Sequence, residues 1–465
     1  MNRAWTAGLA AVVAGCSLGP AYVRPVQDLP PAFLGTAAEA WPAAEWWRGF
    51  GSPELDGLIA DARRYNNDLA AAAARVVQAD AQVRISGAPL LPAVNGTGNF
   101  DYQRTGNSRN RSGFSVPGGG RYSDTRSYQL GLNVSYDLDF WGRNRALAEA
   151  AQASAVATRF DQETVALSIV TSVALTYFQM VAAQDRLRVA MRNLKDAQQI
   201  LAAYRARLSV GTANALDVSQ QEALVAGQLA AIPADRNTIE QQRLALGILT
   251  GRPPERVAVA GGSLEPLPLP AVAPGLPSEL LARRPDVANA EAQLVAQNAN
   301  IRAARAAFFP SVTLTASGGL SSLALSTITG PGTVVASLSS ALTQSIFDNG
   351  LRRGQLTQAR GRYDELLADY RKSVLQSFTD VEQALAALRF TTEQEALERQ
   401  AVAVAQRSSD IAKAQLQAGT IDIITSLNTQ VTLYNDLDAL TQIRLNRFQA
   451  LVNLYKALGG GWKSG

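Results

Sequence analysis

YQLGLNVSYDLDF, at residues 128–140, is the stretch that decides the fold. Every second residue in it is a large apolar one, and each residue between two apolar ones is polar or glycine. A period of two residues is that of a β-strand with one apolar and one polar face. The polar face of this strand carries Asn133, Ser135 and Asp137.

A second strand precedes it, because residues 93–103 alternate in the same way. Its polar face carries Asn95, Thr97, Asn99 and Asp101. We therefore expect a hairpin over residues 93–140, with a polar, glycine-rich loop at residues 104–126. The same pattern returns at residues 311–347, around the turn sequence Gly330-Pro331-Gly332. The chain is thus expected to contribute four strands.

The alternation alone favours a soluble, half-buried sheet over a membrane sheet. Two features favour the membrane: each strand has about the ten residues that a tilted membrane strand needs, and Phe140-Trp141 stands where an aromatic girdle would lie. Four strands are too few to close a barrel, since membrane barrels start at about eight strands. We therefore expect copies of the chain to share one barrel, with the polar faces around a water-filled lumen.

The chain is a tandem duplication. The stretch that begins at Asp68 aligns without gaps to the one that begins at Asp286, and Gly211-Thr212 aligns with Gly419-Thr420. An internal repeat of this kind predicts two copies of one structural plan. We expect a first repeat at residues 54–252, a proline-rich linker at 253–277, a second repeat at 278–458 and a tail at 459–465.

Each repeat contains one very long helical segment. Residues 145–209 hold neither glycine nor proline, and residues 352–417 hold two glycines. A helix of that length reaches about 100 Å, and leucines recur every seven residues from Leu187 to Leu208, the spacing of a supercoiled pair. Pro233 is expected to interrupt a return helix. Shorter helices are expected at residues 54–86, 216–249, 278–308 and 423–458. A cytoplasmic coiled coil is the alternative, but it explains neither the strands nor the N-terminus.

The N-terminus has the layout of an export signal. An apolar run follows Arg3, is too short to span a bilayer, and ends in small residues directly before Cys16. We expect residues 1–15 to be a signal peptide and residues 16–53 an extended segment whose Cys16 carries a lipid. The alternative is an ordinary export signal with an incidental cysteine.

Enzymatic chemistry finds little support in the composition. There is no histidine, the commonest general base, and the single cysteine is Cys16. We expect no catalytic residue, no metal site and no cofactor apart from the lipid. The formal net charge of +4 is spread along the chain, which gives nucleic-acid binding no support.

Several stretches, taken in order, resemble the TolC-like outer-membrane factors and, more narrowly, their lipoprotein branch (NodT/OprM type). They are the run from Cys16 to Pro25, Trp46-Trp47, Arg283-Arg284-Pro285-Asp286, Ala304 to Pro310, and Ile346 to Gly350. The resemblance covers essentially the whole chain. It implies an α+β membrane protein: a homotrimer with a twelve-stranded transmembrane β-barrel, continuous with a long periplasmic α-helical barrel and a mixed equatorial region.

The resemblance also implies a location and a function. The protein would be lipid-anchored in the outer membrane of a Gram-negative cell and extend into the periplasm. It would be the passive exit duct of a tripartite efflux system of RND type, for drugs or other small toxic compounds. Its partners would be a periplasmic membrane-fusion adaptor, an inner-membrane pump and outer-membrane lipid. Two alternatives stay open: the duct of a type I protein secretion system, and a non-conducting structural lipoprotein of the envelope.

The family closes its duct at the periplasmic tip, where the helix pairs turn. The residues that this places at the tip are Gly211, Asp217, Gly419, Asp422, Thr425 and Asn428. Asp217 is also a candidate cap for the return helix, with Gln220 reaching back. The family's aspartates at the positions of Thr425 and Asn428, and its aromatic residue at the position of Leu416, are absent here. We therefore expect a weak polar constriction and no strong acidic ring.

Overall fold

The computed structural model describes residues 22–26, 33, 43–106, 122–272 and 277–462. The expected signal peptide, Cys16 and much of the expected N-terminal segment lie outside the described residues. The chain divides into two units, and each unit combines pieces of both repeats. Unit 1 is Met1–Arg24, Val77–Val156 and Ala292–Ala368, and unit 2 is Pro25–Val76, Ala157–Glu291 and Asp369–Gly465.

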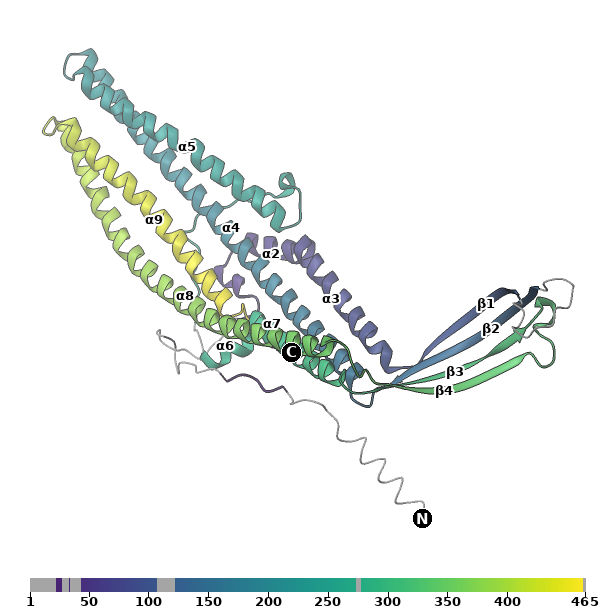
Figure 1. Cartoon of the computed structure of the whole chain (residues 1–465). Helices are drawn as coiled ribbons and strands as arrows, with labels where there is room; N and C mark the ends of the chain where they lie inside the picture. The colour runs from purple at the N-terminus through teal and green to yellow at the C-terminus, as the bar shows by residue number, and fades with distance from the viewer. Residues whose placement is uncertain (1–21, 27–32, 34–42, 107–121, 273–276, 463–465) are drawn as a thin grey trace, which may run out of the picture. The chain divides into compact units, whose positions relative to one another are not determined.

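Unit 1 holds an antiparallel sheet of four strands in the order β1-β2-β3-β4 (Figure 1). The strands are β1 (Ala93–Gly106), β2 (Tyr122–Leu138), β3 (Ser311–Ser322) and β4 (Val334–Thr343). The hairpins of the two repeats are joined by pairing of β2 with β3, in which Asn133 lies opposite Ser317. Within the described sheet, β1 and β4 are therefore the two free edges.

The first hairpin is longer than the sequence pattern predicted. Arg104 pairs with Asp124, and Gly106 pairs with Tyr122, so the expected loop over residues 104–126 was wrong at both ends. Apolar alternation stops there, but the backbone ladder continues because its hydrogen bonds do not depend on side chains. The second hairpin is shorter than predicted, since β4 ends before Ile346.

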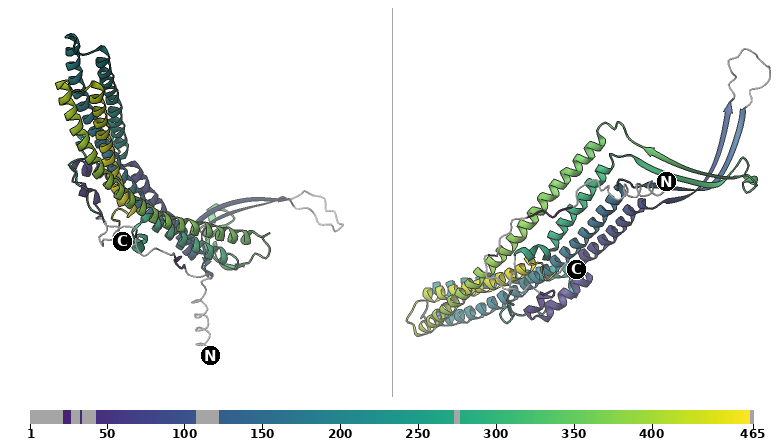
Figure 2. Two further views of the ribbon diagram at one scale, coloured as in Figure 1. Left: turned by 90° about the vertical axis from the view of Figure 1, so that its left-hand side faces the viewer. Right: turned by 90° about the horizontal axis from the view of Figure 1, so that it is seen from below.

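The described part of the chain contains eight α-helices. Their bounds are α2 (Pro53–Tyr65), α3 (Asn67–Gly87), α4 (Arg143–Ser209), α5 (Ala215–Leu249), α6 (Pro277–Arg283), α7 (Pro285–Ala306), α8 (Leu351–Ala418) and α9 (Ile423–Ala457). Short 3-10 turns are η1 (Trp46–Phe50), η2 (Ala88–Leu90), η3 (Pro254–Arg256) and η4 (Leu325–Thr327). With 67 and 68 residues, α4 and α8 are by far the longest helices. In unit 2 they turn back into α5 and α9, giving two helical hairpins (Figures 1 and 2).

Two helices that were expected to be continuous are broken. At Asn66 the backbone is extended, and its Oδ1 accepts hydrogen bonds from the amides two and three residues later, which starts α3 anew. The helix expected at residues 278–308 breaks before Pro285, because proline has no amide hydrogen to donate to the preceding turn. Pro233 was expected to interrupt a return helix. That prediction was wrong, because α5 continues through Pro233.

The core of unit 2 is aromatic. Trp46 stacks on Tyr455 with ring centroids 4.6 Å apart, and Phe178 lies 4.9 Å from Phe50 and 4.8 Å from Phe448. Phe50 and Phe178 are completely buried. These rings come from η1, α4 and α9, so the core ties the segment before the first repeat to helices of both repeats.

Candidate functional site

The first helical hairpin of unit 2 turns between α4 and α5. Gly211 has φ 74°, the left-handed conformation that ends a helix. Asn214 Oδ1 accepts a hydrogen bond from the Asp217 amide at 2.9 Å, and Asp217 Oδ2 accepts one from the Asn214 amide at 3.2 Å. The expected cap was therefore wrong by three residues. Asn214 caps α5, and Asp217 takes the reciprocal position that Gln220 was expected to fill.

The second hairpin turns between α8 and α9 in a related way. Gly419 has φ 71° and follows the end of α8. Asp422 caps α9 by accepting a hydrogen bond from the Thr425 amide at 2.7 Å, and this bond lowers the pKa of its carboxyl. Thr425 and Asn428 are exposed and three residues apart, so they share one face of α9.

The two turns lie together in unit 2. One buried cluster draws residues from all four helices: Leu201, Tyr204, Val218, Leu416 and Ile423. Arg207 Nη2 donates to the Gln417 carbonyl at 3.1 Å, and Lys413 Nζ lies 3.7 Å from Asp196 Oδ2. Leu416, at the position of the family's aromatic residue, is 8% exposed and belongs to this cluster. The candidate tip residues therefore surround a single packed end of the helices.

In unit 1, the seven polar residues chosen from the sequence lie on one face of the sheet. The register sets them in rows that continue onto β3 and β4, such as Asn95-Asn133-Ser317-Ser337 and Ala93-Ser135-Thr315-Ser339. The other four residues are Thr97, Asn99, Asp101 and Asp137. Each is an even number of residues along its strand from a member of these rows, so its side chain lies on the same face. The opposite face carries apolar rows such as Val94-Val134-Ala316-Leu338.

Sequence reasoning missed the polar residues that the second repeat adds to this face. Thr313 Oγ1 donates to Asp137 Oδ1 at 2.6 Å. The hydroxyls of Thr315 and Ser339 are 2.6 Å apart, and those of Ser317 and Ser337 are 2.8 Å apart. The signal was present, since residues 311–322 alternate as the first hairpin does. Both repeats therefore build one continuous hydroxyl-rich face.

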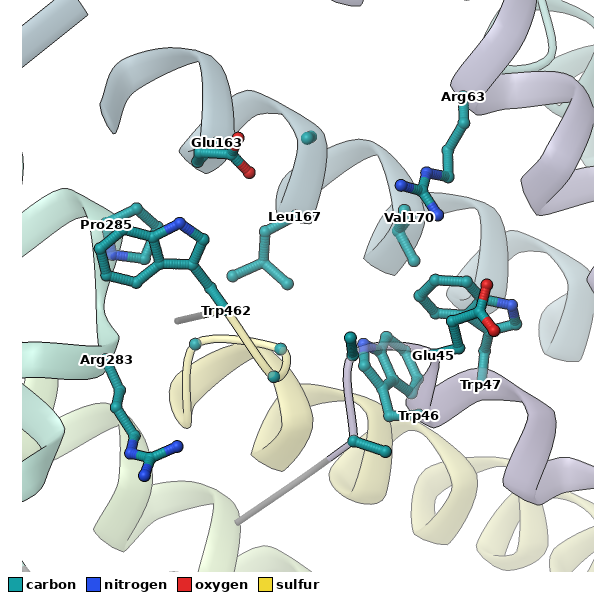
Figure 3. Close-up of a pocket in the computed structure, with 16 residues that line it drawn as sticks. Glu45, Trp46, Trp47, Arg63, Glu163, Leu167, Val170, Arg283, Pro285 and Trp462 are labelled. Carbon is teal, nitrogen blue, oxygen red and sulfur yellow. The ribbon is translucent and has the colours of Figure 1, made fainter. Parts of the chain in front are cut away.

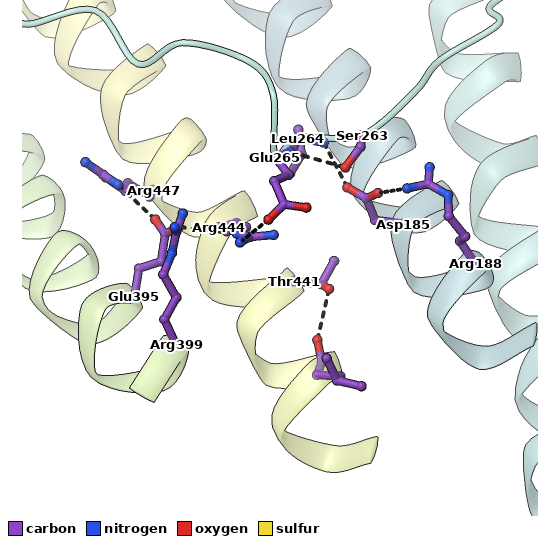
Figure 4. Close-up of polar contacts among 11 residues, drawn as sticks. Asp185, Arg188, Ser263, Leu264, Glu265, Glu395, Arg399, Thr441, Arg444 and Arg447 are labelled. Carbon is purple, nitrogen blue, oxygen red and sulfur yellow. Dashed lines mark hydrogen bonds and ion pairs between the residues drawn. The ribbon is translucent and has the colours of Figure 1, made fainter. Parts of the chain in front are cut away.

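Sequence reasoning also missed a buried ionic cluster in unit 2 (Figure 4). Glu395 of α8 is 3% exposed and accepts hydrogen bonds from Arg399 at 2.6 Å and from Arg447 of α9 at 2.9 Å. Arg444 Nε lies 3.3 Å from the same carboxylate. Burial would raise the pKa of Glu395, but the hydrogen bonds from Arg399 and Arg447 outweigh it and hold the pKa below its usual value.

A second ionic cluster joins three helices of unit 2. Arg186 Nε of α4 donates to Asp438 Oδ1 of α9 at 2.7 Å, and Asp235 Oδ1 of α5 lies 3.9 Å from the same nitrogen. Nearby, the Tyr434 hydroxyl donates to the Asn193 carbonyl at 3.2 Å, and burial raises the pKa of Tyr434 to about 12. These contacts hold α5 and α9 at fixed positions along the axis of α4.

A cavity of about 1080 Å³ lies beside the aromatic core of unit 2 (Figure 3). The indoles of Trp46, Trp47 and Trp462 line it, together with the exposed Arg63 and Glu163. None of the residues expected at the tip or in the barrel lumen lines it. Among the described residues, no group of three or more His, Cys, Asp or Glu side chains is placed to hold a metal ion.

A model of the family described as "Outer membrane efflux protein" matches residues 58–252 and 276–460. The two matched stretches together cover most of the chain. The chain belongs to the outer membrane efflux protein family.

Relatives of this outer membrane efflux protein match over nearly their whole lengths. It is 40% identical to the pyoverdine export outer membrane protein OpmQ of Pseudomonas aeruginosa, over 90% of this chain and 88% of the relative. It is 31% identical to the cation efflux system protein CusC of Escherichia coli (strain K12), over 97% of this chain and 98% of the relative. The open state of the Neisseria gonorrhoeae MtrE outer membrane channel superposes with a TM-score of 0.86 at 29% identity, covering 96% and 99% of the two chains.

Family membership confirms the expected fold class, location and general function. The efflux protein has the architecture of its structural neighbours, trimeric channels in which each chain adds four strands to one barrel. It is an outer-membrane efflux channel, with a helical part that extends into the periplasm. Its relatives are channel proteins and not enzymes.

Proposed function

We propose that this efflux protein is a passive, water-filled exit duct for small molecules. An inner-membrane pump of RND type and a periplasmic membrane-fusion adaptor would load it. The observation that carries the proposal is the continuous polar face of the sheet, whose rows run across all four strands. Turned inward in a barrel, that face gives a wet lumen, while the apolar rows face lipid. Most side chains on this face are neutral hydroxyls and amides, and Asp101 and Asp137 add carboxylates to it.

The relatives support a duct that does not choose its cargo. By name, one exports pyoverdine and another belongs to a cation efflux system, although each aligns with most of this chain. Ducts of one architecture can carry chemically different cargoes if the pump, and not the duct, selects the substrate. We include in the proposal a lipid on Cys16 and a weak polar constriction formed by Asp217, Asp422, Thr425 and Asn428.

Single-channel recording in planar bilayers tests the duct. We expect a stable conductance that Ser317→Trp lowers, because Ser317 lies on the polar face. Ala316→Trp is the matched control, since the neighbouring side chain lies on the apolar face and should leave conductance unchanged. Purified trimers that never conduct would favour a structural lipoprotein and overturn the proposal.

Deletion of the gene tests the cargo class. We expect increased susceptibility to drugs or metal ions, reversed by the intact gene and by Ala316→Trp but less well by Ser317→Trp. Protein export is assayed in parallel. Loss of a secreted protein with unchanged susceptibility would instead assign the duct to protein secretion.

A further inference from the structure

The apolar face of the sheet in unit 1 carries a pair of contacting aromatic rings. Phe100 of β1 lies opposite Tyr128 of β2, and their ring centroids are 4.9 Å apart. Both belong to the apolar rows, because each is an even number of residues along its strand from Val94 or Val134. The chain enters β1 from η2 and leaves β2 toward α4 at one end of this hairpin. The aromatic pair lies in the half of the hairpin that is farther from these helices.

The aromatic pair stands where the outer leaflet of the membrane would lie. The helices of the family's channels extend into the periplasm, so the helix end of the sheet is its periplasmic side. Transmembrane barrels carry aromatic girdles at both edges of their apolar band. Phe140 is the aromatic residue at the helix end, and the stretch from Tyr128 to Phe140 is slightly longer than a tilted membrane strand, which has about ten residues. Phe100 and Tyr128 therefore match the girdle of the outer leaflet.

Two arginines follow the aromatic pair on the same face of the sheet. Arg126 lies opposite Tyr102, one step of this face beyond the pair, and Arg104 lies opposite Asp124 one step further. All four side chains are exposed. The expected loop over residues 104–126 contained both arginines, whereas the observed ladder places them on strands. At this distance beyond an aromatic girdle, long basic side chains reach the headgroups of the lipid.

Arg126 is held in place without using its hydrogen-bond donors. Its Cζ lies 5.8 Å from the centroid of the Tyr102 ring, a cation–π contact. Within the described residues, Arg126 takes part in no ion pair and no hydrogen bond. The N–H donors of its planar guanidinium therefore remain available to an acceptor that does not belong to this part of the chain.

Arg104 forms an ion pair with an aspartate on the same face. Its Nε lies 3.4 Å from Asp124 Oδ1, and both side chains are about half exposed. An exposed ion pair of this kind contributes little stability, so a phosphate can replace the carboxylate as the partner of Arg104. Arg104 and Arg126 are diagonal neighbours in the ladder, about 7 to 8 Å apart, which leaves room for one phosphate group between them. Two cations beside one carboxylate make this edge of the face a site for an anion.

We infer that Arg126 and Arg104 bind a phosphate group of an anionic glycolipid in the outer leaflet of the outer membrane. The acyl chains of that lipid pack on Phe100 and Tyr128, and its phosphate accepts hydrogen bonds from the two arginines. Arginine suits this ligand because a planar guanidinium donates two parallel hydrogen bonds to a phosphate. The inference rests on the proposed function in one respect: the polar face of the sheet turns toward the lumen, which turns the arginines toward lipid.

Titration of purified trimers with phosphorylated lipid A, the glycolipid anchor of lipopolysaccharide, tests the site. The trimers are kept in detergent, and native mass spectrometry measures the fraction that carries lipid A at each concentration. We expect Arg126→Gln to weaken binding about fivefold, the change that corresponds to one arginine near an anionic lipid surface. Asp124→Asn should strengthen binding, because it removes the carboxylate that competes with phosphate for Arg104. This opposite change also serves as the test if Arg126→Gln fails to assemble.

Arg360→Gln is the matched control variant. It makes the same change of charge at an exposed position of unit 1, but on α8 and not on the sheet, so lipid A binding should stay at the wild-type level. Lipid A without phosphates and inorganic phosphate are the two control ligands. We expect the dephosphorylated lipid to bind more weakly and to be insensitive to Arg126→Gln. Inorganic phosphate should not displace lipid A, because it has no acyl chains for the aromatic pair.

The outcomes separate this site from the proposed function. Equal affinity of Arg126→Gln and the wild type for phosphorylated lipid A would overturn the inference, and so would equal binding of lipid A with and without phosphates. Displacement of lipid A by an equal concentration of inorganic phosphate would assign the arginines to a free anion and overturn it as well. Arg126→Gln should keep the wild-type conductance, because its side chain faces lipid and not the lumen. Trimers that bind lipid A as expected but never conduct would count against the duct alone.

Discussion

Asp235 of α5 lies 3.9 Å from Arg186 of α4, yet the hydrogen bonds of that arginine go to Asp438 of α9. Burial raises the pKa of Asp235 by more than Arg186 lowers it, and the charge of Asp438 raises it further. A carboxyl whose pKa is raised by folding binds its proton more tightly in the folded state. Its contribution to stability is therefore full at low pH and is lost as the pH rises through its folded pKa.

Asp235→Asn should raise the free energy of unfolding at about pH 7 by about 1 kcal/mol, because it removes a poorly compensated buried charge. The gain should shrink as the pH falls through the raised pKa of Asp235, because the wild-type carboxyl is then protonated as well. Thermal unfolding at several pH values measures this. Asp438→Asn is the control and should destabilise at neutral pH, since it removes the hydrogen-bonded partner of Arg186. A lower stability of Asp235→Asn at neutral pH would contradict the prediction.

Glu395→Ala should destabilise the protein by about 3 to 5 kcal/mol, since it leaves the arginines around a buried site without their carboxylate. Glu395→Gln should cost less, because it keeps the shape and one acceptor. The lowered pKa of Glu395 means that its stabilisation is present above the unfolded pKa and is lost as the pH falls through the folded value. Glu393→Gln, at an exposed position of the same helix, is the control in chemical denaturation. Equal stability of Glu393→Gln and Glu395→Ala would rule the cluster out as a stabilising element.

Gly319→Ala should prevent correct pairing of β2 with β3. A Cβ at this position would stand 2.6 Å from Gly131 Cα and closer still to the Leu130 carbonyl oxygen. Gly318→Ala is the matched control one residue away, because a Cβ there meets nothing within 4 Å. The amount of trimer in outer-membrane fractions should fall sharply for Gly319→Ala and stay normal for Gly318→Ala. Normal amounts of trimer from both variants would mean that β2 and β3 can move apart at this point without loss of stability.

Replacing Asp217 and Asp422 together with alanine should weaken block of the channel by divalent cations, if rings of these carboxylates line the tip. The same change also removes hydrogen bonds that cap α5 and α9, because both carboxylates accept hydrogen bonds from backbone amides. Replacing both with asparagine keeps an acceptor oxygen and removes the charge, so it separates the two effects. If both double variants keep the wild-type conductance and cation block in single-channel recordings, Asp217 and Asp422 do not contribute to the constriction.

The local structure of this protein follows closely from its sequence. Alternation at residues 128–140 places Asn133, Ser135 and Asp137 on one side of a strand whatever surrounds it, because the pleat has a period of two. Gly211 and Gly419 end their helices because glycine enters the left-handed conformation without strain. Where the sequence reading failed locally, a competing interaction decided the outcome. The side chain of Asn66 began a new helix, and Asn214 took the cap that Asp217 was expected to fill.

Long-range pairing was decided only by the tertiary structure. No spacing in the sequence shows that Arg447 reaches Glu395, that Arg186 lies between two aspartates of other helices, or that Ser317 continues the row of Asn133. Such contacts depend on the crossing and height of helices and on the register of strands, which are set by packing of the whole unit. The sequence by itself determined which faces are apolar or polar and where the chain turns. The fold decided which of those faces meet, because a face has no partner until other segments are brought beside it.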